Sequence, residues 1–553
     1  MADMAGSNVS SLFGYRGRLA SLATPIIAAL ALAGPLIAVR PLMAATALNA
    51  GSTVLADDYL ARVNDQYKPI TADKRSDSVL LPLMGKMAKP PRIIDEPLKA
   101  ALLPATATDW TVVEAWATAD EQKAVLEALK TVTEELDHKK SYAFGLPYGG
   151  DKADPDLVAT GMYVELGDPP TLAGADFKYL PAMVNLGTLI QAETTRLLND
   201  GKPFDALMLL TRGIHLGRQM ADRAFFREKT VGLDMMLLCF NRLRDAAYFD
   251  AQTDAPKLTA ENFREVLRRI RERDGIVGLD RLRLPQGDQA GAEQLFARIM
   301  VPGAGPDEAA FASVLSDITV RERPLRKFSE YAKWDAIRRL HGDEKESRTQ
   351  LANVYGDWEK RWKQKPTDPS LKLPSDYQKL SKAKFAAVSA VVGDIGGMFE
   401  MRRILRVEID GTRVALGISG FQRLRGSFPP ALTSPTPDVL RPQDITPDSL
   451  SGEALRPYGY FVPGRDFPHQ PKDSGKGIDM QIFATDLMGK SFTQFGITLL
   501  DDTFVLFSVG PDTLPNGCRR ATQMVEDDKG DYLIYPSILT LVRKNLNDQK
   551  RFN

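Results

Sequence analysis

The chain has 553 residues, more than one ordinary hydrophobic core can organise, and this length predicts two to four domains. Its hydrophobic fraction of 44% and charged fraction of 26% are typical of folded globular proteins, which excludes a chain that is disordered throughout. Its 71 lysines and arginines are balanced by 71 aspartates and glutamates, so it lacks the basic excess with which nucleic-acid-binding proteins neutralise phosphates. We therefore expect no nucleic-acid partner.

The N-terminal segment carries an uncharged, largely apolar run of 21 residues, Leu19–Val39. As a helix this run would be about 31 Å long, which matches the hydrocarbon core of a bilayer. Arg16 and Arg18 precede it, and flanking positive charge predicts that the N-terminus stays in the cytoplasm. We interpret residues 1–18 as a cytoplasmic tail, 19–39 as a membrane anchor or signal segment, and 40–55 as a tether.

Two interpretations of this segment remain open. A retained anchor would make the chain a single-pass inner-membrane protein with its bulk in the periplasm, so that the membrane is contacted through the N-terminal segment. Cleavage at the small residues Ala45-Thr46-Ala47 would instead release a secreted protein. Both interpretations place the residues from about Gly51 onward outside the cytoplasm. A third interpretation, a buried helix of a soluble protein, is disfavoured by the N-terminal position and the basic flank.

Helical patterns dominate the middle of the chain. Residues 56–150 are predicted to be mixed and partly helical, and residues 151–345 to form a helical domain. The clearest element is a helical hairpin over 181–221, whose turn is Asn199-Asp200-Gly201-Lys202-Pro203. This hairpin is similar to one tetratricopeptide unit, although the chain shows no 34-residue period. Residues 346–397 are predicted to be a charged linker and a helix, with an exposed connection over 342–379.

An arginine- and glutamate-rich stretch over 259–273 has two interpretations, a patch that binds an anionic surface or an exposed helix with internal ion pairs. The regular alternation of charges favours the exposed helix. The only two cysteines are Cys239, in an apolar helical run, and Cys518. Their number excludes a cysteine-based zinc site, we expect Cys239 to be buried, and the sequence leaves open whether the two thiols pair.

The C-terminal region, residues 398–553, changes character. A long helix is predicted over 398–425, where Met398, Met401, Leu405, Ile409, Leu416 and Phe421 recur near helical spacing. The strand-like runs Thr493–Leu499 and Thr503–Val509 flank a short turn and predict a hairpin, and Tyr532–Tyr535 is a further β-prone run. The predicted fold class is therefore mainly α, with helical hairpins that are tetratricopeptide-like on one interpretation, plus a small C-terminal α+β module in which the long helix packs on an antiparallel sheet.

Three strings in this region carry a resemblance: Gly426-Ser427-Phe428-Pro429-Pro430, Asp448-Ser449-Leu450-Ser451-Gly452, and Ser508-Val509-Gly510-Pro511-Asp512. Their order resembles the C-terminal part of uncharacterised exported proteins of planctomycete bacteria, which is itself similar to the globular domain of type II secretion pseudopilins. The resemblance implies an anchored envelope protein and brings no established activity with it. The prepilin-peptidase motif Gly-Phe-x-x-x-Glu is missing before residues 19–39, so assembly into a filament is not implied.

The same resemblance implies a calcium site. Pseudopilins of this type bind calcium in the loop after the hairpin. Asp512 occupies the position of the aspartate in their Ser-x-Gly-x-Asp motif. Asp527, Asp528 and Asp531 follow it in the chain. Calcium takes several carboxylate oxygens as ligands, so these four aspartates are the candidate metal ligands. The alternative interpretation is an acidic loop in which aspartates stabilise turns.

The sequence shows no recognisable catalytic motif. We therefore predict an exported or envelope-anchored scaffold that binds a protein partner in the cell envelope, because paired helices offer extended binding surfaces. The alternative function is an extracytoplasmic hydrolase whose site is assembled from distant carboxylates. A deep pocket with convergent carboxylates would favour the hydrolase, and a shallow groove along the helices would favour the scaffold.

Overall fold

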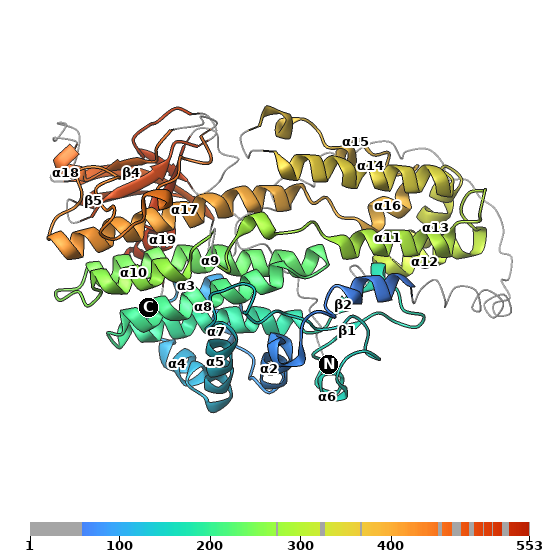
Figure 1. Cartoon of the computed structure of the whole chain (residues 1–553), viewed down its shortest axis with the longest axis horizontal. Helices are drawn as coiled ribbons and strands as arrows, with labels where there is room; N and C mark the ends of the chain where they lie inside the picture. Colours follow the sequence, from blue (N-terminus) through green and yellow to red (C-terminus); the bar gives the residue numbers. More distant parts are fainter. Residues whose placement is uncertain are drawn as a thin grey trace.

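A computed structural model describes the chain in ten segments, 58–272, 275–320, 327–364, 368–451, 456–466, 477–485, 492–500, 503–510, 513–522 and 530–551. These segments are mainly helical and carry one small sheet near the C-terminus, as the sequence predicts (Figure 1). Among them, no helix combines the length and the apolar character that crossing a membrane requires. The predicted anchor or signal segment, 19–39, lies outside the described residues.

Three long helices form the centre of the molecule: α7 (Leu180–Asn199), α8 (Pro203–Ala221) and α9 (Phe226–Ala251). The helices α7 and α8 confirm the predicted hairpin. Gly201 adopts φ +67° in the turn, a conformation that glycine reaches without strain, and Pro203 begins the next helix. Helices α8 and α9 approach backbone to backbone, because a Cβ at Gly232 would lie 2.4 Å from the Gly217 carbonyl oxygen.

Shorter N-terminal elements pack around these helices, several of them along the lower edge of Figure 1. They are α2 (Ser76–Met84), α3 (Pro97–Leu102), α4 (Trp110–Ala117), α5 (Asp120–Val132), α6 (Pro155–Ala159) and the antiparallel pair β1 (Val164–Glu165) and β2 (Asp176–Phe177). The region 56–150 is thus partly helical, as predicted.

A second helical group lies at the end of the molecule away from the sheet (Figure 1). Its members are α11 (Gln286–Ile299), α12 (Glu308–Val320), α13 (Lys327–Arg338), α14 (Glu344–Lys363), α15 (Asp376–Lys379) and α16 (Ala386–Val391). The prediction of an exposed connection over 342–379 is wrong for its first half. Helix α14 buries Leu351, Val354 and Trp358, and its abundant charges occupy the remaining faces. A narrow apolar stripe among many charges is enough to dock a helix.

The arginine-rich stretch forms α10 (Ala260–Arg269). Arg264 pairs with Glu261 and Arg268 with Glu265, each at 2.7 Å on one helical face. These contacts confirm the interpretation as a helix with internal ion pairs. Arg269 differs from the others, because it is buried and also reaches Glu134 at 2.8 Å.

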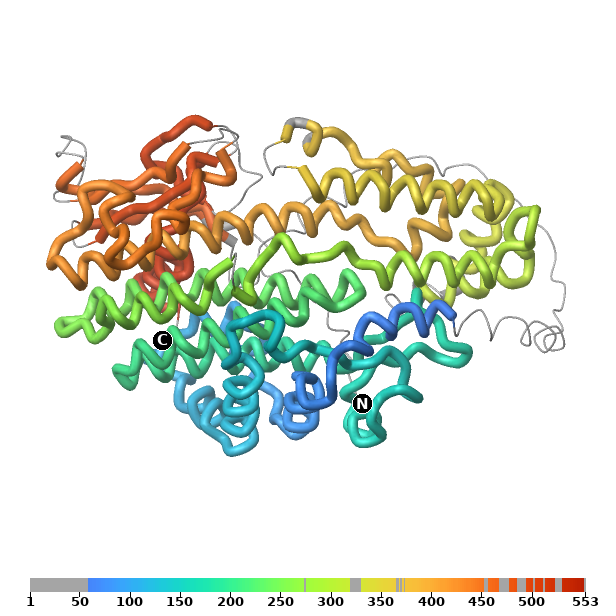
Figure 2. Tube along the Cα trace, viewed as in Figure 1, coloured from blue at the N-terminus to red at the C-terminus, as the bar shows by residue number. Residues whose placement is uncertain are grey.

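The predicted long helix is α17 (Gly396–Arg425), which runs from the second helical group to the sheet (orange in Figure 2). It is buried on two faces. Met398, Met401, Leu405, Ile409 and Leu416 join the core of the helical body, whereas Val407, Val414, Ala415 and Ile418 pack with residues of the sheet. The long helix therefore packs on the sheet as predicted, but it does so through this second set of residues and not through the predicted stripe, which packs on the helical body.

The sheet has six strands in the order β3-β6-β8-β7-β4-β5. They are β3 (Gly459–Phe461), β4 (Gly477–Thr485), β5 (Phe492–Leu500), β6 (Val505–Ser508), β7 (Arg520–Thr522) and β8 (Asp531–Tyr535). The pairs β4–β7 and β7–β8 are parallel and the others antiparallel, so the sheet is mixed instead of purely antiparallel.

The predicted hairpin between 493–499 and 503–509 is wrong, although both runs are strands. Strand β5 pairs along nine residues with β4, and β6 pairs with β3 and β8. Strand β5 therefore lies at the edge of the sheet, whereas β6 lies inside it. Strand β4 supplies a longer and better matched partner than the four-residue β6 could.

Both faces of the sheet are covered. Leu506 packs with residues of α17, and its neighbour Phe507 packs with residues of α19 (Ile538–Asp548), a C-terminal helix that the sequence analysis did not predict. Neither side chain is more than 5% exposed. The central strands β6 and β8 are thus an internal layer between two helices, as their uninterrupted burial indicates, whereas β4 and β5 alternate between buried and more exposed positions.

The backbone contact between α8 and α9 gives a test of this packing. We expect Gly232→Ala to lower the free energy of unfolding by about 1–3 kcal/mol, because the new methyl group meets backbone atoms that cannot move aside. Gly356→Ala in α14 is the matched control, since no heavy atom lies near its Cβ position and alanine favours helices by up to about 1 kcal/mol. Urea unfolding measures both variants. A Gly232→Ala variant as stable as the Gly356→Ala variant would contradict the close approach.

Candidate functional site

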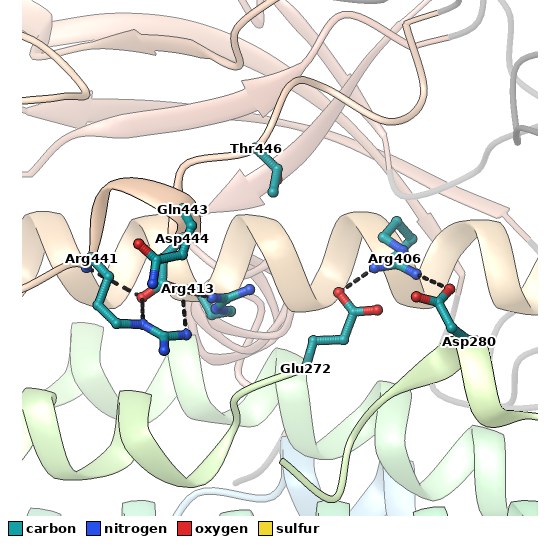
Figure 3. Close-up of a pocket in the computed structure, with 8 residues that line it drawn as sticks. All are labelled: Glu272, Asp280, Arg406, Arg413, Arg441, Gln443, Asp444 and Thr446. Carbon is teal, nitrogen blue, oxygen red and sulfur yellow. Dashed lines mark hydrogen bonds and ion pairs between the residues drawn. The ribbon is translucent and has the colours of Figure 1, made fainter. Parts of the chain in front are cut away.

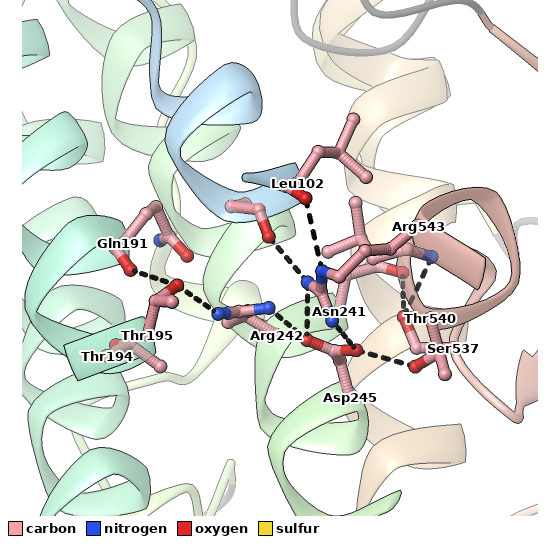
Figure 4. Close-up of polar contacts among 12 residues, drawn as sticks. Leu102, Gln191, Thr194, Thr195, Asn241, Arg242, Asp245, Ser537, Thr540 and Arg543 are labelled. Atoms are coloured by element: carbon pink, nitrogen blue, oxygen red, sulfur yellow. Dashed lines mark hydrogen bonds and ion pairs between the residues drawn. The ribbon is translucent and has the colours of Figure 1, made fainter. Parts of the chain in front are cut away.

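A buried ion cluster, here called the α9–α19 joint, connects the C-terminal helix to the helical body (Figure 4). Its centre is Asp245 on α9, which accepts hydrogen bonds from Thr540 at 2.6 Å and from Arg543 at 2.9 and 3.0 Å. Arg242 also donates to Asp245, and its other nitrogen donates to Thr195 on α7 at 2.7 Å. Arg543 further reaches the Leu102 carbonyl oxygen at the end of α3. Four helices are therefore connected through Asp245 and the two arginines that contact it.

The charges of the α9–α19 joint are set by this pairing. Burial alone would raise the pKa of Asp245, but Arg543 and Arg242 lower it to about 2. Burial lowers the pKa of Arg242 to about 10, which leaves it protonated at neutral pH. One buried carboxylate thus faces two buried or half-buried guanidinium groups. Removing it would leave two cations without their shared counter-charge.

A second buried cluster, the α9–α17 joint, is formed by Arg244, the residue that precedes Asp245 on α9. Arg244 of α9 pairs with Glu408 of α17 at 2.6 Å and donates to Thr412 at 2.5 Å. Asn241 donates to the same carboxylate at 3.1 Å, and Tyr532 of β8 donates to its other oxygen at 2.6 Å. All these groups are buried. The helical body, α17 and the sheet are therefore tied together through Glu408.

A polar pocket, here called the α17 pocket, opens between α17, the segment after α10 and the segment after α17 (Figure 3). Its volume is about 110 Å³. The lining consists of charged and polar side chains: Glu272, Asp280, Arg406, Arg413, Arg441, Gln443, Asp444 and Thr446. Asp280 lies in the short helix η4 (Leu279–Arg281) and Asp444 in η7 (Pro442–Asp444).

The pocket has two ends that differ in their pairing. At one end, Arg406 contacts both Glu272 and Asp280, the latter at 3.1 Å. At the other end, Asp444 contacts both Arg413 and Arg441, the latter at 2.9 Å. Two carboxylates thus share one arginine at the first end, and two arginines share one carboxylate at the second.

Asp410 lies on α17 between Arg406 and Arg413, 3.7 Å from the Arg413 guanidinium. Burial raises the pKa of Asp410 to about 6, even though Arg406 and Arg413 act in the opposite direction. A carboxyl group with such a pKa exchanges protons near neutral pH, which is the property of a general acid. Asp410 does not line the α17 pocket, but it lies beside the pocket's Arg413 and titrates close to physiological pH.

The structure places only one of the four predicted calcium ligands. Asp531 begins β8 and is buried, and its Oδ2 accepts hydrogen bonds from the backbone nitrogens of Cys518 at 2.7 Å and Asn516 at 3.2 Å. It thus anchors the loop before β7. Asp512, Asp527 and Asp528 lie outside the described residues, and within the described segments no group of three carboxylate, histidine or cysteine side chains is arranged to hold a metal. The calcium site stays a prediction.

Both cysteines are free and buried, which answers the question that the sequence left open. Cys239 lies inside α9, as predicted, and its thiol is 3.6 Å from the Gln191 amide nitrogen. Burial raises the pKa of Cys239 to about 12, so this thiol is unreactive at neutral pH.

The sequence analysis identified neither the joints nor the pocket. The residues of the pocket are separated by up to 174 positions in the chain, from Glu272 to Thr446. One signal was present: charged residues interrupt the apolar helix α9 at Arg242, Arg244 and Asp245, where a helix that is buried all round would otherwise be apolar. Buried charges require partners, so this interruption could have marked the joints.

Comparisons with known proteins place the chain in no family. No family model, no curated protein and no solved structure matches it.

The α9–α19 joint predicts how Asp245→Asn responds to pH. Because the folded-state pKa of Asp245 is depressed to about 2, its ionised form stabilises the fold above about pH 4, and this contribution is lost as the pH falls through 2. We expect Asp245→Asn to cost about 3–5 kcal/mol at pH 7, since it leaves two buried cations unpaired, and less at pH 3. Urea unfolding at the two pH values measures the difference. The exposed Asp120→Asn is the control, and an equal deficit at both pH values would contradict the assignment.

Proposed function

We propose that the protein is an exported, envelope-associated scaffold that holds a protein partner. The observation that supports this most is the pair of buried joints on α9. They fix the sheet and α17 against the helical body, so surfaces on the two parts keep one relative position. A rigid body with distant surfaces in fixed relation is what a scaffold requires, whereas binding of a single small substrate does not need it.

The surface that we assign to the partner is the helical tip, defined as Val301, Tyr331 and Leu340. These exposed apolar residues belong to the loop after α11 and to α13 and its end, and Leu340 is 66% exposed. Helix α13 lies at the end of the molecule opposite to the sheet (Figure 1). Exposed aromatic and aliphatic side chains at the end of a rigid helical body are suitable anchors for a protein interface.

Export is supported by the apolar run Leu19–Val39 and the preceding Arg16 and Arg18. We expect Asp120→Cys, at a fully exposed position on α5, to react with a membrane-impermeant maleimide added to intact spheroplasts. Ser7→Cys, in the predicted cytoplasmic tail, should react only after lysis. The two natural thiols are buried and keep the background low.

The reverse labelling pattern, with the Asp120→Cys thiol protected until lysis, would place the bulk of the chain in the cytoplasm and contradict export. The mass of the purified mature chain separates a retained anchor from a cleaved signal segment. Its result decides between an inner-membrane and a secreted scaffold.

The partner is tested by crosslinking in whole cells. We expect the wild-type chain to form a defined crosslinked species with an envelope protein, and the double variant Tyr331→Ser, Leu340→Ser to lose it, because the anchor side chains are removed. Leu424→Ser with Leu500→Ser is the matched control, since both leucines are exposed but lie in α17 and at the end of β5. If the crosslinked species is lost in the Leu424→Ser, Leu500→Ser variant but kept in the Tyr331→Ser, Leu340→Ser variant, the partner binds near the sheet and not at the helical tip.

One observation favours the alternative, an extracytoplasmic hydrolase. The α17 pocket brings Glu272, Asp280 and Asp444 together from distant parts of the chain, beside Asp410 with its raised pKa. Each of the three lining carboxylates contacts an arginine, however, which holds it in place and leaves it less accessible to a substrate. Hydrolysis of chromogenic glycosides by the purified chain, lost in Asp410→Asn, would replace the scaffold with the hydrolase.

A further inference from the structure

We propose that the α17 pocket binds a small zwitterion of dipeptide size, with the ligand's ammonium group at Glu272 and Asp280 and its carboxylate at Arg413 and Arg441. This ligand site goes beyond the scaffold function. It rests on an unpartnered buried oxygen, on the opposite pairing of the two ends, and on the spacing between them.

The ammonium end is defined by Glu272, which is only 5% exposed. Its Oε2 pairs with Arg406, while its Oε1 has no hydrogen-bond partner among the residues that the structure describes. A buried carboxylate oxygen needs a donor, and an ammonium group offers three N–H donors together with a positive charge. Asp280 stands at the mouth of the pocket with a side chain that is 77% exposed, so it supplies a second acceptor where a ligand enters.

The carboxylate end is defined by two arginines around one aspartate. Arg413 is buried, Arg441 keeps 29% of its side chain exposed, and both contact Asp444 (Figure 3). A guanidinium group donates in a planar fork that matches a carboxylate, and this geometry suits a second carboxylate beside Asp444.

The overall charge of the pocket selects a neutral ligand with separated charges. Asp410 lies 3.7 Å from Arg413 and Arg402 lies 3.9 Å from Asp280, so the charges of the pocket and its neighbours are close to balanced when both ends are taken together. A ligand with one net charge would upset this balance next to the buried side chains of Glu272 and Arg413. A zwitterion adds one charge of each sign and leaves the balance unchanged.

The spacing sets the size of the ligand. Arg406 and Arg413 are seven residues apart on one helix, which corresponds to a rise of about 10 Å. A fully extended dipeptide is about 7 Å long, and with a hydrogen bond of about 3 Å at each end it can bridge this distance. A single amino acid is too short for both ends, and the volume of about 110 Å³ leaves no room for a long peptide.

The probe is glycylglycine, measured against the full-length chain by isothermal titration calorimetry. We expect glycylglycine to bind, and both glycylglycine amide, which lacks the carboxylate, and acetylglycylglycine, which lacks the ammonium group, to bind at least about tenfold more weakly. Equal binding of acetylglycylglycine would show a simple anion site and overturn the proposal. Equal binding of glycylglycine amide would show a simple cation site and would also overturn the proposal. Absence of binding at millimolar glycylglycine would show that the pocket holds only water, which overturns the proposal as well.

Two variants test the assignment of the ends without unfolding the chain. Asp280→Asn leaves Arg406 paired with Glu272, and Arg441→Gln leaves Asp444 paired with Arg413. We expect each to raise the Kd for glycylglycine at least about tenfold with an unchanged melting temperature. Arg268→Gln, on the exposed face of α10, is the matched control and should leave the Kd unchanged. Unchanged affinity in both pocket variants contradicts the site and leaves the scaffold function untouched, because the helical tip is not involved.

Discussion

The buried charges of α9 are the constraint on which the rest of the structure depends. Taking an ion out of water costs several kcal/mol, and only a matched counter-ion with further hydrogen bonds offsets that cost. Helix α9 carries such ions into the interior near its start, where Glu228 accepts from Arg223 at 2.9 Å and from Tyr148 at 2.6 Å, and again at Arg242, Arg244 and Asp245.

These buried ion pairs fix how the helices dock on one another more than they raise the free energy of unfolding. An apolar contact tolerates a small slide of one helix along another, whereas Arg244 reaches its two partners on α17 only where Glu408 and Thr412 lie beside it. A shift of α17 by one residue would leave a buried guanidinium group and a buried carboxylate apart, at a cost of several kcal/mol. The joints therefore select one docking of α17, α19 and the sheet among the many that apolar packing alone would allow.

Much of the secondary structure followed from periodicity. The hairpin over 181–221 and the helix over 398–425 were predictable because apolar residues recur at helical spacing and Gly201 and Pro203 mark the turn between the two helices of the hairpin. The strand runs before and after Leu500 were also predictable from their residue types. Local signals of this kind report on the conformation of a segment and on which residues are buried.

Pairing and docking were not predictable by the same means. The pattern of α17 showed an apolar stripe but not which neighbour covers it, since Met398 and Val414 are equally apolar and pack against different layers. Strand β5 pairs with β4 because of its length and register, which a turn signal at residues 500–502 does not reveal. Ion pairs such as Arg543–Asp245 join residues 298 positions apart, and no local pattern connects them. The α17 pocket depends on such long-range placement and was not predicted at all.

The joints and the α17 pocket are linked through one helix. Arg406 and Arg413 lie on α17 on either side of Glu408, the residue that the α9–α17 joint holds in place. Glu272 and Asp280 follow α10, which also packs against α17, while Asp444 follows α17 itself. The two ends of the pocket therefore face each other only when α17 is docked in the arrangement that the joints select. A ligand that spans both ends binds this docked form alone and stabilises it by mass action. In a scaffold, such coupling would make the fixed relation between the sheet and the helical tip stronger when the pocket is filled.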